Sequence, residues 1–254
     1  MNSRVKLTKP TLPILATVVS ITREKFIQRG RTLACTIALG LAGSFALALP
    51  ECAFEDRLAT RSDIHDWQYT LVDTTWRLPA DYEPDDLVSL REAGFDDDRL
   101  IRAVVIEDLS AMRQAAIEAG VPIAVQSAYR SYAYQHNTFD YWVGIQGREA
   151  ALGSSARPGH SEHQLGTVLD FRSEGGPAAW DMEDWAETPA GAWMVDNSWR
   201  YGFVLSYPKD ASHLTCYIYE PWHYRYLGRD RARLVHESGL TLRELLWHES
   251  GMDR

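Results

Sequence analysis

The sequence has little cysteine, little positive charge beyond its first fifty residues and no internal repeat. Three cysteines among 254 residues are too few for a disulfide scaffold that replaces a hydrophobic core. The first fifty residues hold seven of the 26 basic residues and one of the 35 acidic ones, which leaves 19 basic against 34 acidic side chains in residues 51–254. This formal charge of −15 repels nucleic acid and anionic lipid, so neither is expected as a partner.

A long apolar run occurs once. The uncharged segment Leu33–Leu49 follows a basic stretch and ends in the small residues "ALA". This order is typical of a secretory signal, so residues 1–50 are predicted to be a signal peptide or an uncleaved signal anchor, with cleavage near Ala48 favoured. The protein is therefore expected to be exported, to the extracellular space or the cell envelope, and an uncleaved leader would anchor it to the membrane.

Two of the three cysteines, Cys52 and Cys216, lie in the exported part. An oxidising exterior permits them to pair, and we predict a disulfide; two unrelated buried thiols are the alternative. The polar and aromatic residues 51–98 are interpreted as an N-terminal extension that packs on a core domain, residues 99–254.

Residues 52–254 contain no linker, so helices and short antiparallel strands are expected to share one core in an α+β fold. Apolar periodicity and glycine or proline punctuation predict the elements. Helices are expected over 84–94, 96–120, 132–147, 178–200 (interrupted near Pro189) and, as a pair around Gly239, 229–250. Strands are expected over 123–126, 167–171, 201–207 and 215–228, and residues 147–160 are expected to form a loop.

The segment "SEHQLGTVLDFR" places a carboxylate, Asp170, inside an apolar run of strand-like length. Burying an unpaired carboxylate costs several kcal/mol, so a cation must neutralise it. His163 lies seven residues upstream, and His223 lies in a later segment, "EPWHYRY". Two imidazoles and a carboxylate suit one zinc ion per chain and leave a fourth position open for water. The sequence therefore predicts a zinc site made by His163, Asp170 and His223.

Glu220 precedes His223 by three residues. Residues three apart in a flat strand face opposite sides, but Pro221 can break the ladder and let both side chains reach one pocket. We interpret Glu220 as a general base because catalytic zinc usually has three protein ligands; four ligands would make the site closed and structural. His160 is left out of the ligand set because Pro158 and Gly159 argue against a helix that would align it with His163.

Four segments, in order, resemble the VanY-type D-alanyl-D-alanine carboxypeptidases, a zinc metallopeptidase group that includes lysostaphin-type enzymes and the hedgehog signalling domain. The resemblance covers roughly residues 99–230, and its segments are "SAYRSYAYQ", "GHSEHQLGTVLDF", "YGFVLSYP" and "EPWHYRYLG".

The resemblance implies a single α+β domain with a central antiparallel sheet flanked by helices, and the removal of terminal D-alanine from peptidoglycan stem peptides. By position it makes His163, Asp170 and His223 the ligands and Glu220 the base, and it gives Arg130 the role of stabilising the scissile carbonyl and its oxyanion. It also assigns substrate-binding roles to Ser127, Tyr129, Gln135, Ser161 and Tyr201.

Alternatives remain for these residues and for the activity. A salt bridge would explain Arg130, and capping or turn roles would explain Ser127, Gln135 and Ser161. An L,D-carboxypeptidase, a peptidoglycan endopeptidase and a silent cell-wall binding module stabilised by metal are the rival functions. We expect a monomer whose partners are stem peptides ending in D-alanine.

Overall fold

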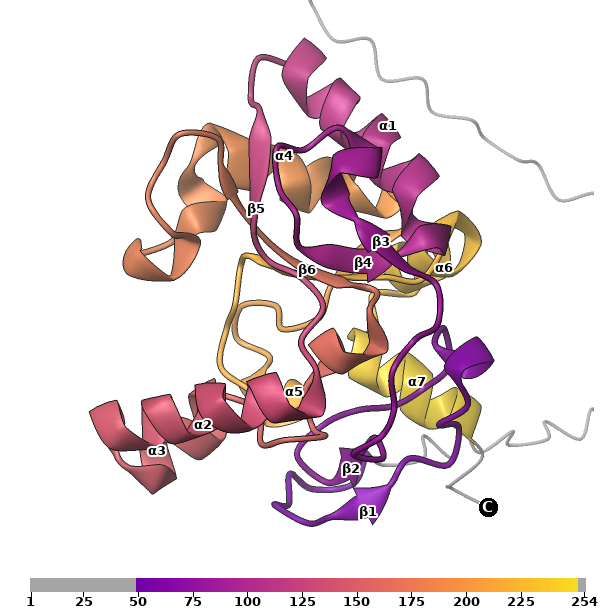
Figure 1. Cartoon of the computed structure of the whole chain (residues 1–254), viewed down its shortest axis with the longest axis vertical. Coiled ribbons are helices and arrows are strands. Elements are labelled where there is room, and N and C mark those ends of the chain that lie inside the picture. The colour runs from indigo at the N-terminus through magenta and orange to yellow at the C-terminus, as the bar shows by residue number, and fades with distance from the viewer. Residues whose placement is uncertain (1–48, 251–254) are drawn as a thin grey trace, which may run out of the picture. The chain divides into compact units, whose positions relative to one another are not determined.

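Four antiparallel strands form the central sheet in a computed structural model that describes residues 49–250 (Figure 1). The predicted leader, residues 1–50, lies outside these residues apart from its last two. The strand order is β5-β6-β8-β7. The bounds of these strands are Ile123–Ser127 for β5, Val168–Ser173 for β6, Phe203–Leu205 for β7 and His223–Tyr226 for β8.

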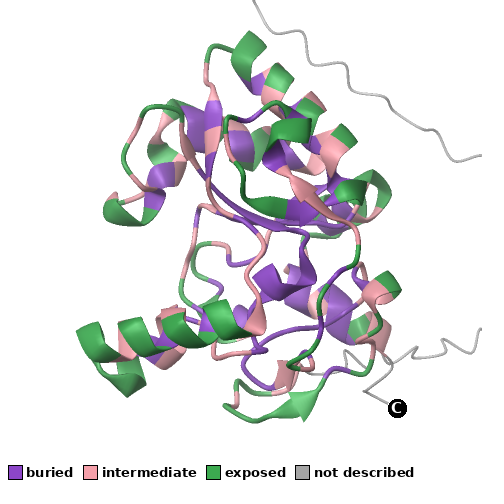
Figure 2. Ribbon diagram, in the orientation of Figure 1, coloured by how far each residue is buried: buried purple, intermediate pink, exposed green. Residues whose placement is uncertain are grey.

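The two inner strands, β6 and β8, separate an apolar face from a polar one. Leu169 and Phe171 of β6 and Tyr224 of β8 are fully buried and belong to the main hydrophobic core. The alternate residues, which include Asp170 and His223, point to the opposite face because successive side chains in a strand alternate. Both faces are covered, as the buried colour of this sheet shows (Figure 2). The polar face is therefore buried, together with the charged and titratable side chains that it carries.

Helices cover both sides of the sheet. Leu109 and Met112 of α1 and Met194 of α4 belong to the apolar core, while α2 and α3 pack against each other at the end of the sheet's polar side (Figure 1). Among residues 49–250, no helix combines the length and apolarity that a bilayer span requires. The helices are α1 Ile106–Glu118, α2 Tyr132–Gln146, α3 Arg148–Ser154, α4 Pro189–Asn197, α5 Ser212–Thr215, α6 Arg229–Ser238 and α7 Leu242–Ser250.

The predicted α+β class and antiparallel sheet are confirmed, and the helix predicted over 132–147 matches α2. The helix predicted over 84–94 is wrong. Residues Leu87–Ser89 form β3, which pairs with β4, Leu100–Arg102, and only a 3-10 turn, Leu90–Ala93, follows. Because of this pairing, α1 begins at Ile106 and not at residue 96, where we predicted its start. A cross-strand partner here outweighs local helical periodicity.

Three further element predictions are wrong. Residues 147–160 include a short helix, α3, although we expected only a loop. Pro189 begins α4 instead of interrupting a longer helix, because Thr188 caps the helix and proline suits its first position. Of residues 215–228, only His223–Tyr226 forms a strand, since the preceding residues turn to bond with Gly153 of α3 and with Tyr207, which follows β7.

The segment that follows the predicted leader is tied to the chain near the polar face. A disulfide joins Cys52 to Cys216, as predicted from the sequence. Arg157 donates hydrogen bonds to the Asp56 carboxylate and to the carbonyls of Glu55 and Thr74. Two short parallel strands, β1 (Arg57–Leu58) and β2 (Trp76–Arg77), complete this region. Chain segments far apart in sequence thus meet beside the residues that lead to Glu220.

Replacing both Cys52 and Cys216 by serine should lower the free energy of unfolding by about 2–4 kcal/mol, because the bridge closes a long loop and restricts the unfolded chain. Chemical denaturation of the oxidised protein and the variant measures the difference. With a reductant present the wild-type protein loses the bridge as well, so the difference should then disappear, which is the matched control. Equal stability of the oxidised wild-type protein and the double variant would contradict the prediction.

Candidate active site

The register of the central sheet brings the predicted metal ligands together. Asp170 lies opposite His223 in the β6-β8 ladder and opposite Ser127 in the β5-β6 ladder. His163 comes from a 3-10 turn, Glu162–Leu165, that directly precedes β6. Gly166 ends this turn with a φ of +72°, and a Cβ there would lie 2.8 Å from the Arg102 side chain, so only glycine fits. The turn therefore folds His163 back over Asp170.

The three predicted ligands form one buried cluster. One potential ligand atom from each of His163, Asp170 and His223 lies within 4.8 Å of the other two. His163 Nε2 lies 3.2 Å from Asp170 Oδ2, and His223 Nδ1 lies 3.2 Å from Asp170 Oδ1. Despite these short distances, His163 Nε2 and Asp170 Oδ1 have no hydrogen-bond partner. Their lone pairs are thus left for a shared cation.

Hydrogen bonds on the far side of each imidazole orient the rings. His163 Nδ1 lies 2.6 Å from the carbonyl oxygen of Ala128, so this nitrogen donates and Nε2 is left as the ligand atom. His223 Nε2 lies 3.0 Å from Glu162 Oε2, which leaves Nδ1 toward Asp170. The two rings contact each other at 85° with centroids 4.9 Å apart. The two histidines would therefore bind a metal through different ring nitrogens.

The charges around the cluster favour a bound cation. Burial, together with the positive charge of Arg130, lowers the pKa of His163 to about 4, so its imidazole is neutral at pH 7. Burial also acts to lower the pKa of His223, but the neighbouring carboxylates of Asp170 and Glu162 outweigh it and raise this pKa to about 10. Burial acts to raise the pKa of Asp170, yet the two histidines hold it below its ordinary value. Two nitrogens and an anionic oxygen fit zinc, which would replace the proton on His223.

Glu162 and Arg225 form a second layer behind His223, and the sequence reasoning missed both. Arg225 is fully buried; it donates to Glu162 Oε1 at 2.8 Å and to the carbonyls of Trp67 and Thr70. Burial acts to raise the pKa of Glu162, but the charge of Arg225 and the bond with His223 lower it to about 2. Glu162 lies within "SEHQ", next to His163, but its carboxylate contacts the other histidine, which no local pattern indicates.

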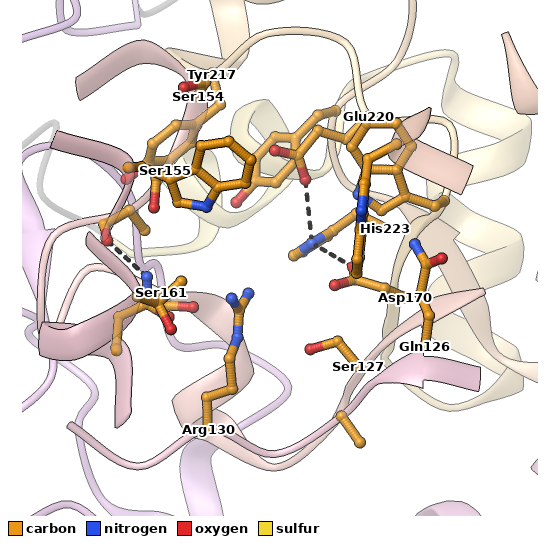
Figure 3. A pocket seen from close by; sticks show the side chains of 18 of the residues that line it. Gln126, Ser127, Arg130, Ser154, Ser155, Ser161, Asp170, Tyr217, Glu220 and His223 are labelled. Carbon is orange, nitrogen blue, oxygen red and sulfur yellow. Dashed lines mark hydrogen bonds and ion pairs between the residues drawn. The ribbon is translucent and has the colours of Figure 1, made fainter. Parts of the chain in front are cut away.

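Glu220 reaches the cluster from a turn. The His223 amide donates to the Glu220 carbonyl, and the Glu220 amide donates to the carbonyl of Tyr207. This turn, which contains Pro221, brings the Glu220 carboxylate to 3.5 Å from His223 Nδ1 (Figure 3). Burial raises the pKa of Glu220 to about 7, against the lowering effects of His223 and Arg130. A carboxyl group with such a pKa can both accept and return a proton near neutral pH.

A cavity of about 620 Å³ opens onto this cluster. Arg130, Ser127, Tyr129, Gln135 and Ser161 all line it, together with Asp170, Glu220 and His223. Figure 3 shows Arg130 and Ser127 projecting into the same space as Glu220 and His223. Six of the polar residues that we identified from the sequence thus share one cavity with two of the three ligands.

Tyr201 does not belong to this group. Its ring stacks on Trp193 and lies beside the Arg229 guanidinium, and it is not among the residues that line the cavity. Tyr201 therefore lies apart from the other predicted substrate-binding residues: it ends a 3-10 turn before β7, on the side that packs with α4, and its substrate-binding role stays a prediction.

Ser161 and His160 both form hydrogen bonds that stabilise the surrounding chain. Ser161 accepts a hydrogen bond from the His163 amide and so caps the turn, while it also lines the cavity. His160 is fully buried, with Nδ1 at 2.7 Å from the Asp73 carbonyl and Nε2 at 2.9 Å from Asp56. These bonds occupy both ring nitrogens, which agrees with its exclusion from the ligand set.

Comparison with known proteins adds independent information. The family model of VanY, D-alanyl-D-alanine carboxypeptidase, matches residues 98–229, more than half of the chain. The chain belongs to this family. The match spans all four strands of the central sheet, and it includes His163, Asp170 and His223. The family also accounts for the mixed helix and sheet fold, which is that of the hedgehog-type peptidases.

Individual relatives agree with this membership. YodJ of Bacillus subtilis, described as a carboxypeptidase, is 39% identical over 178 residues, which are 68% of this chain and 65% of that protein. The chain thus spans about two thirds of this curated relative. A VanY D,D-pentapeptidase in complex with Zn(II) is 31% identical, with a TM-score of 0.61 and coverage of 71% of this chain and 99% of that one.

The same VanY protein has been solved with D-alanine-D-alanine, with equal identity and TM-score and 72% of this chain covered. The LD-carboxypeptidase LdcB is 36% identical, with a TM-score of 0.61 and coverage of 70% of this chain and 84% of its own. The solved structures that are similar to this chain therefore include both a D,D-pentapeptidase and an LD-carboxypeptidase.

Replacing Glu162 by glutamine should weaken zinc binding about 10- to 100-fold. The neutral amide holds the proton on His223 Nε2 less strongly than the carboxylate does, so Nδ1, which faces Asp170, is a poorer ligand. Titration of the metal-free protein with zinc, in competition with a chromophoric chelator, measures the affinity. Glu174→Gln, an exposed substitution just beyond β6, is the matched control. Equal zinc affinities for the two variants would show that Glu162 does not act on the metal site.

Proposed function

We propose that this protein is an exported, zinc-dependent D-alanyl-D-alanine carboxypeptidase that removes the terminal D-alanine from peptidoglycan stem peptides. The observation that carries the proposal is a single cavity that opens onto a His, Asp and His cluster and is lined by a buried carboxyl group and a guanidinium. Family membership and the Zn(II) complex of a VanY relative support it. One zinc ion per chain would be held by His163, Asp170 and His223.

The residues of the cavity divide the chemistry between them. Bound zinc would supply Lewis acidity that polarises the scissile carbonyl and lowers the pKa of water. Glu220 takes the proton from the attacking water and returns it to the amine of the leaving D-alanine. Arg130, which retains a buried Nε without a partner, offers its guanidinium to the oxyanion that forms at the carbonyl. Ser127, Tyr129, Gln135 and Ser161 would hold polar groups of the peptide.

Export completes the proposal, together with the monomeric state that we expect from the sequence. The basic, then apolar, residues 1–50 are the basis for export, and the disulfide between Cys52 and Cys216 is compatible with an oxidising compartment. The acidic surplus of the remaining chain agrees with a soluble peptide substrate better than with an anionic polymer such as nucleic acid.

An L,D-carboxypeptidase is the second candidate, and the similarity to LdcB at 36% identity favours it. The two activities differ at one stereocentre on the acyl side of the scissile bond, and the metal cluster and Glu220 serve both. Mass spectrometry of the products from tetrapeptide and pentapeptide stems distinguishes them, because a D,D enzyme shortens only the pentapeptide.

The purified protein with zinc should release D-alanine from a pentapeptide that ends in D-alanyl-D-alanine. The Glu220→Gln variant should lose turnover by at least about 10³-fold, because the neutral amide cannot take up and return the proton, yet it should retain zinc. Coupled detection of D-alanine and metal analysis measure the two properties. Absence of D-alanine release by the wild-type protein would reject the D,D activity.

Replacing Arg130 by methionine should reduce kcat by about 10²- to 10³-fold with less effect on KM, because the lost guanidinium acts on charge that develops in the transition state. Steady-state kinetics on the same pentapeptide separate the two parameters. Arg99→Met, at another edge of the cavity, is the matched control. If Arg130 were only a structural salt-bridge residue, the variant would lose thermal stability and keep its kcat.

A further inference from the structure

The cavity extends well beyond the metal cluster along α2. Its lining includes Tyr134, Thr138, Trp142 and Gln146, which recur at four-residue steps and therefore share one face of the helix. We call these four residues the α2 stripe. With a rise of about 1.5 Å per residue, the stripe runs for about 18 Å.

This length exceeds what the leaving group needs. A carboxypeptidase releases a single residue, and an extended residue spans about 3.3–3.6 Å, so about five residues fit along the stripe. Only the acyl side of the substrate, the part that remains after cleavage, is long enough to occupy it. The cavity of about 620 Å³ agrees with an occupant larger than a dipeptide.

The chemistry of this part of the cavity suits an uncharged peptide backbone. None of the cavity-lining residues that α2 and α3 contribute is charged; besides the stripe they are Gln135 and Ser154. Gln135 is 1% exposed, and its Oε1 has no partner although its Nε2 donates to the Ala156 carbonyl. This oxygen can accept a hydrogen bond from a peptide N–H group. The aromatic rings of Tyr134 and Trp142 offer flat surfaces to aliphatic and amide groups.

Part of this aromatic surface has no cover from the protein itself. Tyr134 is 60% exposed although its side chain contributes to the cavity wall, and Figure 2 shows exposed residues along much of α2. We propose that the α2 stripe binds the acyl-side residues of the stem peptide and sets a preference for long stems over D-alanyl-D-alanine itself. This inference rests on the proposed function and assigns its substrate-length specificity to residues remote from the metal cluster.

The test compares kcat/KM for N-acetylated peptides of two to five residues, all ending in D-alanyl-D-alanine. The wild-type value should rise about tenfold or more from the dipeptide to the pentapeptide. Trp142→Ala should lower the pentapeptide value about tenfold and change the value for the shortest cleaved peptide less than twofold. Trp142→Phe should restore most of the loss, and Tyr134→Ala should act in the same direction as Trp142→Ala.

Ile145→Ala is the matched control, because Ile145 is 64% exposed on the same helix and is not a cavity-lining residue. Circular dichroism verifies that each variant is folded. Equal losses on short and long peptides, or no loss on either, would overturn the inference while the proposed activity stands.

If the wild-type protein cleaves none of these peptides, the proposed function fails, but calorimetry still tests the stripe. The Glu220→Gln variant should bind the pentapeptide more tightly than the dipeptide, and adding Trp142→Ala should remove this difference. Equal binding of both peptides to Glu220→Gln would overturn the inference.

Discussion

The contact of His223 with Asp170 and Glu162, within a buried sheet, is the interaction on which the site depends. Both β6 and β8 present an apolar face to α1 and α4. The side chains at the alternate positions of these strands must therefore point to the other face. A register slip of one residue would turn the ligands into the apolar core and Phe171 or Tyr224 into the cavity. The apolar packing on one face therefore fixes the position of charged groups on the other.

Buried charges of this density persist because each has a partner. Arg225 balances Glu162, Glu162 orients His223, and His223 approaches Asp170. The carbonyl groups that hold Arg225 belong to Trp67 and Thr70, which precede the segment matched by the family model. The N-terminal region thus helps to hold the predicted metal site without supplying one of its predicted ligands. Removing one member of such a series leaves the charge of its neighbour buried and unpaired in a medium of low polarity.

The cavity joins two kinds of surface. Near the sheet, charged and titratable groups converge beside Asp170 and His223, while along α2 the lining is aromatic and uncharged. In the proposed function, the first surface carries the reaction and the second distinguishes substrates by their length. Because α2 begins directly after Arg130, a single turn of chain separates the two functions.

The sequence by itself determined the fold class, and it predicted the residues that the structure brings together as His163, Asp170, His223, Glu220 and Arg130, because sequence motifs and a carboxylate in an apolar run are local features. It also indicated α2, whose helix has its own cap at Ser131 and needs no partner to be recognised. It failed for residues 84–94, where pairing of β3 with β4 replaced a helix, and it did not separate Tyr201, which stacks on Trp193, from the residues that line the cavity. Only the tertiary structure decided that Glu162 serves His223 and not its neighbour His163, that Arg225 is buried behind both, and that α2 walls the cavity. These contacts join residues tens of positions apart, and their geometry follows from the sheet register and the packing of side chains, neither of which has a local pattern in the chain.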